Sequence, residues 1–289
     1  MAARGLNPSK LRDYCTLTKP EVNLLVLMTT AAGYYLASPG PVDRLGMVNT
    51  LLGTLLVASG TATLNQWMER SWDAQMRRTA NRPVPAGRIS PRRAFWFGIS
   101  MSVAGGLYLA ILVNWLAAVL AISTLLSYLL IYTPLKRRTP LCTLLGALPG
   151  AMPILIGWSG AAAPIDLRAW FLFAIVFLWQ FPHFLAIALI YREDYDRAGY
   201  KMLPEFDADG HFTRAEIVSF TVILVAVTGL WELRSGALSS FVVTLAGVLL
   251  LYPAFRLLRN SSKTMARWVV HGSVSYLPVL LFLAMLHKR

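Results

Sequence analysis

The sequence predicts an all-α integral membrane protein with nine transmembrane helices. Of its 289 residues, 56% are hydrophobic and only 14% are charged, whereas soluble domains carry about 25% charged residues. Nine runs come close to the roughly 20 mostly apolar residues that a spanning helix needs. The 27 Lys and Arg residues also gather in alternate loops, which is typical of a multi-pass protein with basic cytoplasmic loops.

Charges, prolines and glycines separate these apolar runs. In chain order the expected spans are 22–38, 46–66, 94–113, 115–133, 141–160, 168–190, 215–233, 237–255 and 267–286. A short hairpin near Asn114 is all that divides spans three and four, and the segment 232–236 divides spans seven and eight. Because no loop exceeds about thirty residues, residues 1–289 are expected to form a single transmembrane domain without a soluble domain.

The distribution of charge predicts the orientation. With a cytoplasmic N-terminus, 22 of the 27 basic residues lie on inner segments, and the C-terminus lies outside. The net charge of +13 is therefore attributed to membrane topology, and no nucleic-acid partner is expected. The N-terminal segment has no apolar stretch that would act as a secretory signal, so the simplest location is a bacterial inner membrane.

Two long inner segments, 67–93 and 191–214, hold most of the charged chemistry and predict an active site near the cytoplasmic face. The first adjoins a stripe of Asn65, Glu69 and Asp73, whose spacing of four places them on one helix face. Such a stripe suits Mg²⁺, which typically binds one or two carboxylates and substrate phosphates. The alternative is a solvated helix end, with Glu69 paired to Arg70 or Asp73 to Arg77.

Arginines follow this stripe directly. Two prolines and a glycine within 83–87 end the helix and fold the chain back. The turn is expected to bring three cations close to the carboxylates, where arginine suits bidentate phosphate binding: Arg77, Arg78 and Arg82. The pattern predicts a site for a metal-bridged diphosphate.

The second inner segment follows a span that contains His183. A histidine within a span is a candidate functional residue, and the alternative is a core histidine satisfied by its neighbours. Asp194 comes eleven residues later, which predicts that it shares a face with His183 on one continuous helix. Asp196 falls on another face and is expected to be a solvated charge.

Several motifs together resemble a known family. The run NQWMERSWDAQMRRTANRPVPAG (65–87) resembles the first aspartate-rich signature of the UbiA-type intramembrane prenyltransferases. Its D-x-x-M-x-R-T-x-x-R-P core is similar to the protohaem IX farnesyltransferases, or haem O synthases. The same subfamily resembles this chain at WQFPHF (179–184), YREDYDRAGYKMLP (191–204), LTKP (17–20), YTPLKRRTP (132–140) and GAMPILIGW (150–158).

The resemblance implies a nine-helix UbiA-type bundle around a central cavity that opens near the cytoplasmic face. It implies that farnesyl diphosphate binds there through Mg²⁺ and that its farnesyl group is transferred to a vinyl group of haem B, giving haem O. The partners implied are these two substrates, the lipid bilayer, and a haem A synthase or terminal oxidase assembly proteins.

The resemblance also assigns roles to residues. Its catalytic positions match Asn65, Asp73, Asp194 and His183, and its metal positions match Asn65, Glu69, Asp73 and Asp194. Positions around the diphosphate match Arg78, Arg82, Lys136, Arg137 and Lys201, and His183 is expected to face the haem. Two departures stand out. Tyrosines bracket Asp194 where related enzymes carry a second carboxylate, and Cys142 stands where relatives generally have asparagine.

Three other functions remain open from the sequence. A UbiA-type enzyme acting on an aromatic quinone precursor would share the fold, although the W-Q-x-P-H-F and R-T-x-x-R-P runs argue against it. A transporter would place ionisable residues near mid-membrane, whereas the carboxylates here cluster at one face. A non-catalytic haem-binding assembly factor would keep His183 but would not require Asn65 or Asp73.

Overall fold

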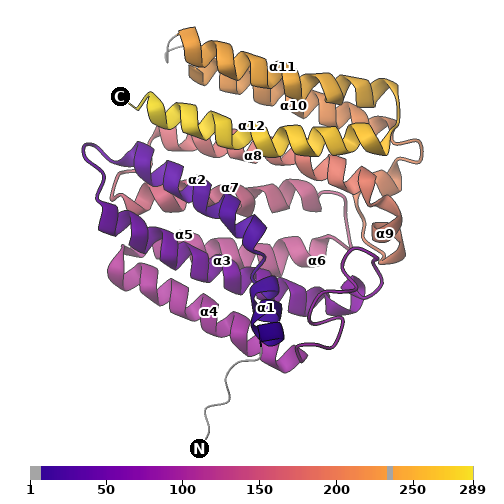
Figure 1. The fold of residues 1–289 in the computed structure, drawn as a ribbon, viewed down its shortest axis with the longest axis horizontal. Helices are drawn as coiled ribbons and strands as arrows, with labels where there is room; N and C mark the ends of the chain where they lie inside the picture. The colour runs from indigo at the N-terminus through magenta and orange to yellow at the C-terminus, as the bar shows by residue number, and fades with distance from the viewer. Residues whose placement is uncertain (1–7, 233–236, 289) are drawn as a thin grey trace, which may run out of the picture.

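The computed structural model describes residues 8–232 and 237–288, and all regular structure within them is helical. In these ranges, eight helical segments are long and apolar enough to cross a membrane. They are α3 (Arg44–Asp73), α4 (Pro91–Leu112), the continuous run of α5 (Trp115–Ser127), η1 (Tyr128–Tyr132) and α6 (Thr133–Leu135), α7 (Cys142–Gly160), α8 (Leu167–Ile190), α10 (His211–Glu232), α11 (Ala237–Arg259) and α12 (Lys263–Leu286). Figure 1 shows these long helices lying side by side.

The first expected span, 22–38, corresponds to α2 (Pro20–Ala37), which has 18 residues. Its first turn carries Glu21 and its buried face includes Asn23, Thr29 and Thr30, and it is not among the eight segments long and apolar enough to cross a membrane. It nevertheless lies inside the bundle, packed against α7 and α3 (Figure 1). The exact count of nine and the orientation of the termini stay predictions.

The helix α7 forms the centre of the bundle. Within its most apolar stretch 72% of the residues are buried, against 22% for α4 at the edge. Small residues allow α2 to approach it closely, because a Cβ added at Gly157 would collide with the Thr30 backbone and one at Gly33 with the Ile154 backbone. This close approach is typical of helix packing in membranes, where small residues rather than hydrophobic burial favour contact.

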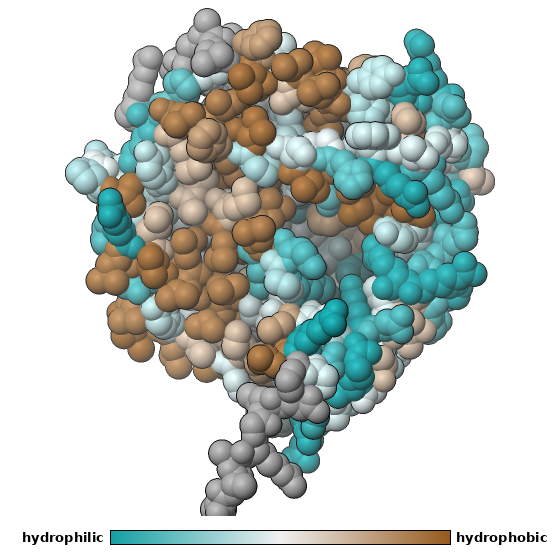
Figure 2. Space-filling model, in the orientation of Figure 1, coloured by the Kyte–Doolittle hydropathy of each residue, from teal (hydrophilic) through white to brown (hydrophobic). Residues whose placement is uncertain are grey.

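The two ends of the bundle differ in polarity. Figure 2 shows hydrophobic side chains over much of the left and centre of this face and hydrophilic ones gathered toward the right. In the same orientation, the loop after α3 and the short helix α9 (Arg192–Arg197) lie at the right end, and the C-terminus lies at the left (Figure 1). The two long charged segments therefore meet at one end of the bundle, opposite the C-terminus.

Several local features differ from the sequence expectations. The prediction that His183 and Asp194 share one helix face is wrong, because α8 ends at Ile190 and Tyr191 turns the chain with φ −107° and ψ 23° before α9 begins. The second expected span is longer than 46–66, since α3 continues to Asp73 and carries Glu69 on its last turns. Two short helices were not expected: α1 (Pro8–Leu17) and the 3₁₀ turn η2 (Leu203–Phe206).

Candidate functional site

The stripe on α3 forms the floor of the candidate site. Asn65, Glu69 and Asp73 are 1%, 4% and 1% exposed, so all three lie on one buried face of the helix, as their spacing predicts. Two carboxylates this deeply buried need compensation, because an ionised carboxylate removed from water is costly unless it is paired.

Each member of the stripe contacts a cation from a different part of the chain. Lys136 Nζ lies 2.9 Å from Glu69 Oε1, and Arg82 Nη1 lies 2.7 Å from Asp73 Oδ2. Lys19 Nζ donates to Asn65 Oδ1 at 3.2 Å. Glu69 is therefore paired with Lys136 and Asp73 with Arg82, rather than with Arg70 or Arg77, and the arrangement gathers three cations around two anions.

A π-helical turn brings Lys136 to the site. Pro134 has no N–H to donate, which interrupts the helical hydrogen-bond pattern, and η1 widens the preceding turn. Thr133 Oγ1 then donates to the Tyr128 carbonyl at 2.9 Å and accepts from Asn65 Nδ2 at 3.2 Å. Such widened turns often mark functional sites. Burial opposes the charge of Lys136, but the neighbouring Glu69 raises its pKa well above the ordinary lysine value.

Lys19 reaches Asn65 from the break between α1 and α2. It has the left-handed backbone conformation, with φ 51°, and Pro20 starts the next helix. This conformation is uncommon for a residue other than glycine and often occurs at functional sites. Burial, followed by repulsion from Arg82 and Lys136, lowers the pKa of Lys19 to about 7. An added anion would therefore stabilise the charged form of this lysine.

Two buried oxygens face this cluster without a hydrogen-bond partner among the described residues. One is Asp73 Oδ1, the oxygen that Arg82 does not contact, and the other is the Tyr200 hydroxyl. The Tyr200 pKa is raised, first by burial and then by the charge of Glu69, which places that hydroxyl in the field of the same carboxylate. Buried polar atoms are nearly always satisfied in native proteins, so an unpaired carboxylate oxygen here indicates a place for a ligand.

Asp194 lies at the wall of the site rather than in the stripe. Its Oδ2 accepts from the Arg78 backbone N–H at 3.1 Å, and its Oδ1 accepts from Arg197 at 3.1 Å. Burial alone would raise the pKa of Asp194. The backbone hydrogen bonds from Arg78 and Arg77, together with the charge of Arg197, lower it below the ordinary value. Its Oδ2 therefore holds α9 against the loop after α3, while its Oδ1 is paired within α9, and its role as a metal ligand stays a prediction.

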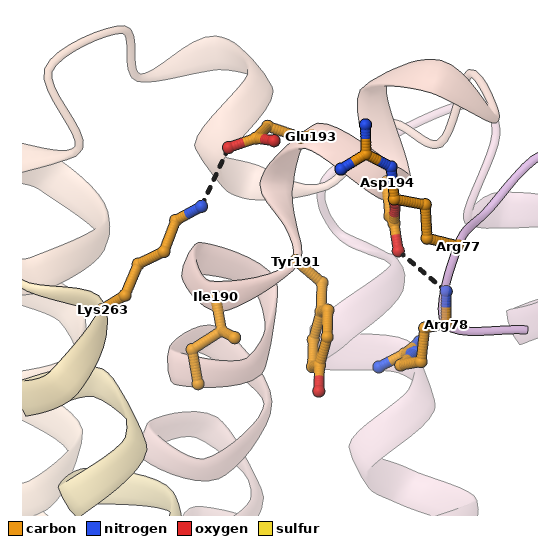
Figure 3. A pocket seen from close by; sticks show the side chains of 7 residues that line it. All are labelled: Arg77, Arg78, Ile190, Tyr191, Glu193, Asp194 and Lys263. Carbon is orange, nitrogen blue, oxygen red and sulfur yellow. Dashed lines mark hydrogen bonds and ion pairs between the residues drawn. The ribbon is translucent and has the colours of Figure 1, made fainter.

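A cavity of about 400 Å³ opens beside Asp194 (Figure 3). Its walls come from the loop after α3, the α8–α9 junction and the start of α12: Arg77, Arg78, Ile190, Tyr191, Glu193, Asp194 and Lys263. The Arg78 guanidinium lies 4.5 Å from the centre of the Tyr191 ring and donates to the Tyr195 hydroxyl at 3.1 Å. The tyrosines that replace a second carboxylate therefore hold an arginine.

The remaining predicted diphosphate residues lie farther from the stripe. The Lys201 side chain pairs with Glu205, while its backbone N–H donates to the Lys136 carbonyl at 2.6 Å. Arg137 is exposed and lies 4.6 Å from the centre of the Trp72 ring. Their part in binding diphosphate stays a prediction. Cys142 is fully buried, with its Sγ 3.8 Å from the Met202 sulfur.

Comparison with known proteins identifies the family. Residues 26–286 match the UbiA prenyltransferase family. The chain belongs to this family. Its curated relatives include the protoheme IX farnesyltransferase of Solibacter usitatus. The two sequences are 44% identical over 96% of this chain and 99% of the relative. The protoheme IX farnesyltransferase of Koribacter versatilis is 41% identical over 97% of this chain and 94% of the relative. That of Opitutus terrae is 38% identical over 97% and 96%.

Solved structures of UbiA homologues confirm the fold. A homologue from Aeropyrum pernix K1 superposes with a TM-score of 0.74 at 18% identity, covering 92% of this chain and 97% of that one. A homologue from Archaeoglobus fulgidus bound to GPP and Mg²⁺ gives a TM-score of 0.66 at 15% identity, covering 94% and 99%. The predicted all-helical UbiA-type architecture is therefore confirmed.

Sequence reasoning missed part of this UbiA site. Lys19 lies in the LTKP motif, but a lysine before a spanning segment is typical of a topological anchor, which conceals its contact with Asn65. Thr133 and Tyr200 lie in the YTPLKRRTP and YREDYDRAGYKMLP motifs. A Thr-Pro pair inside an apolar run was the available signal for a helix irregularity near Lys136.

Proposed function

We propose that this UbiA-family protein is a Mg²⁺-dependent prenyltransferase that forms haem O from farnesyl diphosphate and haem B. We place it in a bacterial inner membrane with its active site near the cytoplasmic face. The observation that carries the proposal is the buried cluster in which three cations meet two carboxylates and one carboxylate oxygen stays unpaired. The acceptor is inferred from the full-length relatives that are named protoheme IX farnesyltransferases.

The cations around the stripe are suited to bind the diphosphate of the prenyl substrate. Lys19, Arg82 and Lys136 converge on the stripe, and Arg78 borders the adjoining cavity. Diphosphate gains negative charge as the C1–O bond of the prenyl chain breaks, and fixed cations stabilise that charge most where water is excluded. Arg82 can reorient toward the phosphates because its side chain is 25% exposed, whereas its partner Asp73 is held in the core.

The residues of the stripe fit a magnesium ion. The chain offers two buried carboxylates and a buried amide there, which leaves part of the coordination of an ion to the substrate phosphates. One or two carboxylates completed by substrate phosphates is the usual mode of Mg²⁺ binding. Asp73 would hold the ion through its unpaired Oδ1, with Glu69 and Asn65 beside it. Bound Mg²⁺ neutralises the leaving diphosphate.

Transfer of the farnesyl group to haem B also consumes one molecule of water. The prenyl C1–O bond breaks, and the terminal vinyl carbon of haem B bonds to C1. The positive charge then lies on the vinyl carbon next to the porphyrin, where water adds and releases a proton. Aromatic rings near the stripe stabilise the allylic cation before this bond forms: Tyr128 and Tyr132 are 4.9 Å apart between ring centres, and Lys136 lies 4.5 Å from the latter.

The alternatives make different demands on the structure. A transporter would need ionisable residues along a path through mid-membrane, whereas Glu69 and Asp73 lie on the last turns of α3. An enzyme acting on an aromatic quinone precursor would use the same diphosphate site and differs only in its acceptor. Haem A synthase or terminal oxidase assembly proteins as downstream partners stay a prediction.

The direct test uses the purified full chain in lipid nanodiscs with farnesyl diphosphate, Mg²⁺ and haem B. Mass spectrometry is expected to show haem O, and EDTA is expected to abolish its formation until Mg²⁺ is restored. Binding of Mn²⁺ in place of Mg²⁺, followed by electron paramagnetic resonance, checks the metal separately from turnover. Haem O formed equally well in EDTA would contradict the metal assignment, and no haem O under any condition would contradict the proposal.

A further inference from the structure

The hydroxyl of Tyr200 is buried beside the stripe without a hydrogen-bond partner. The residue is 2% exposed, and its hydroxyl makes no hydrogen bond within the described part of the chain. A buried hydroxyl without a partner destabilises a protein, because it has given up its hydrogen bonds to water. Native proteins keep few such groups, and each of them calls for an explanation. This hydroxyl is therefore a candidate donor for a state in which the groups around it have moved.

The backbone on both sides of Tyr200 holds the ring in this place. Gly199 ends α9 in the left-handed conformation, with φ 67°, which favours glycine. The Tyr200 N–H then donates to the Tyr195 carbonyl at 3.0 Å, and the Lys201 N–H donates to the Lys136 carbonyl at 2.6 Å. The ring itself packs in a buried apolar cluster. Because the backbone is held and the ring is packed, the hydroxyl stays beside the stripe.

Glu69 is the acceptor that this hydroxyl faces. After burial, the charge of Glu69 is the next cause that raises the pKa of Tyr200, so the carboxylate and the phenol are close neighbours. Lys136 belongs to the same group, because its Nζ lies 2.9 Å from Glu69 Oε1 and 5.9 Å from the centre of the Tyr200 ring. The three side chains form a cluster in which the lysine donates to the carboxylate and the phenol does not.

Diphosphate binding changes the demand on Lys136. Among the described residues it is the side chain that donates to Glu69, and under the proposed function it also binds the diphosphate. An ammonium group that moves toward a phosphate oxygen lengthens or breaks its bond to the carboxylate. Glu69 is 4% exposed, so water does not replace the lost donor, and a buried carboxylate that loses a donor is costly. A second donor beside Glu69 removes that cost.

We propose that Tyr200 is a positioning residue that donates its hydroxyl hydrogen to Glu69 when Lys136 turns to the diphosphate. One oxygen of Glu69 then accepts from the phenol, and the other stays available to the metal site. The phenol suits this task because it is a neutral donor and adds no charge beside the lysine. This inference rests on the proposed function and adds to it the group that keeps Glu69 in place while the diphosphate binds.

The first test compares stability with binding in Tyr200→Phe. Without ligand, the midpoint of thermal unfolding in nanodiscs is expected to equal or exceed that of wild type, because the substitution removes an unsatisfied buried hydroxyl. Calorimetric binding of farnesyl diphosphate with Mg²⁺, in the absence of haem B, is expected to weaken about 10-fold, the effect of losing one hydrogen bond to a charged group. The KM for farnesyl diphosphate should rise in parallel, while the KM for haem B stays the same. A lower midpoint with unchanged binding is the behaviour of a structural residue and overturns the proposal.

The matched control is Tyr276→Phe in α12. Tyr276 is also buried, at 3% exposed, but its hydroxyl contacts Thr228 Oγ1. The same substitution there removes a satisfied hydrogen bond, so the midpoint of unfolding is expected to fall and the binding of farnesyl diphosphate to stay unchanged. The two variants should therefore show opposite patterns. Equal weakening of binding in both would show that the effect is not specific to Tyr200 and would overturn its role.

A double-mutant cycle identifies the acceptor of the hydroxyl. In a Glu69→Gln background, Tyr200→Phe is expected to weaken the binding of farnesyl diphosphate little further, because the effects of two residues that bond to each other do not add. Fully additive effects would mean that the hydroxyl donates to the diphosphate itself, which overturns the assignment to Glu69.

These measurements separate the inference from the proposed function. If wild type binds farnesyl diphosphate with Mg²⁺ but forms no haem O, the proposed acceptor is contradicted, and the binding comparison still decides the role of Tyr200. Wild type that binds no farnesyl diphosphate overturns both.

Discussion

Asp73→Asn is expected to lower kcat/KM for haem O formation by about 10²–10³-fold, the usual effect of removing one preorganised electrostatic group. The substitution keeps the shape of the side chain but removes the charge of a buried carboxylate that has an unpaired oxygen. It also leaves Arg82 without its 2.7 Å ion pair. Mass spectrometry of haem O at several concentrations of farnesyl diphosphate measures the effect, and Mn²⁺ binding should weaken in parallel.

The matched control for Asp73 is Asp13 on α1. Asp13 also pairs with an arginine, since its Oδ1 lies 2.9 Å from Arg88 Nε, but it does not belong to the stripe. Asp13→Asn is expected to leave haem O formation close to the wild-type rate. Equal loss in the two variants, or a near-normal rate in Asp73→Asn, would show that the stripe does not hold the metal and the diphosphate.

Lys136→Met is expected to destabilise the protein by about 3–5 kcal/mol, because it leaves Glu69 charged and unpaired in the core. The pair is buried, with side chains 14% and 5% exposed. In Glu69→Gln/Lys136→Met no charge remains unpaired, so most of that stability should return. Haem O formation should stay low in both variants, because the double variant lacks a cation for the diphosphate and a carboxylate for the metal. Unfolding in mixed micelles and product formation are measured side by side.

An exposed ion pair provides the stability control. Arg168 pairs with Asp166 at 2.8 Å, but their side chains are 60% and 37% exposed, and such pairs contribute little. Arg168→Met is therefore expected to leave the free energy of unfolding nearly unchanged. If the double variant at Glu69 and Lys136 recovered haem O formation along with stability, the pair would be structural only.

The sequence was sufficient for features that depend on local periodicity. Apolar runs predicted the long helices, and the spacing of four predicted that Asn65, Glu69 and Asp73 would share one buried face. Of the three arginines expected close to the stripe, Arg82 makes an ion pair with Asp73, although α3 ends at Asp73 itself and not at the prolines that follow. In each case the signal lies within one helix or one turn, where helical geometry fixes the outcome.

Features that depend on irregular backbone were not predictable in the same way. A regular helix through Tyr191 would have kept His183 and Asp194 on one face, but the break there sends Asp194 to the loop after α3. The π turn before Thr133 and the left-handed backbone of Lys19 also redirect cations toward the stripe. Such conformations are stabilised by tertiary contacts, which outweigh the local propensities that a sequence pattern reports.

The measurement that tests the central claim most directly is a choice of acceptors. Purified protein receives farnesyl diphosphate and Mg²⁺ with equal amounts of haem B and 4-hydroxybenzoate, an aromatic acid of the kind used in quinone synthesis. Mass spectrometry is expected to show haem O as the main product and diphosphate released in equal amount. A prenylated aromatic acid without haem O would keep the diphosphate site and contradict the proposed acceptor.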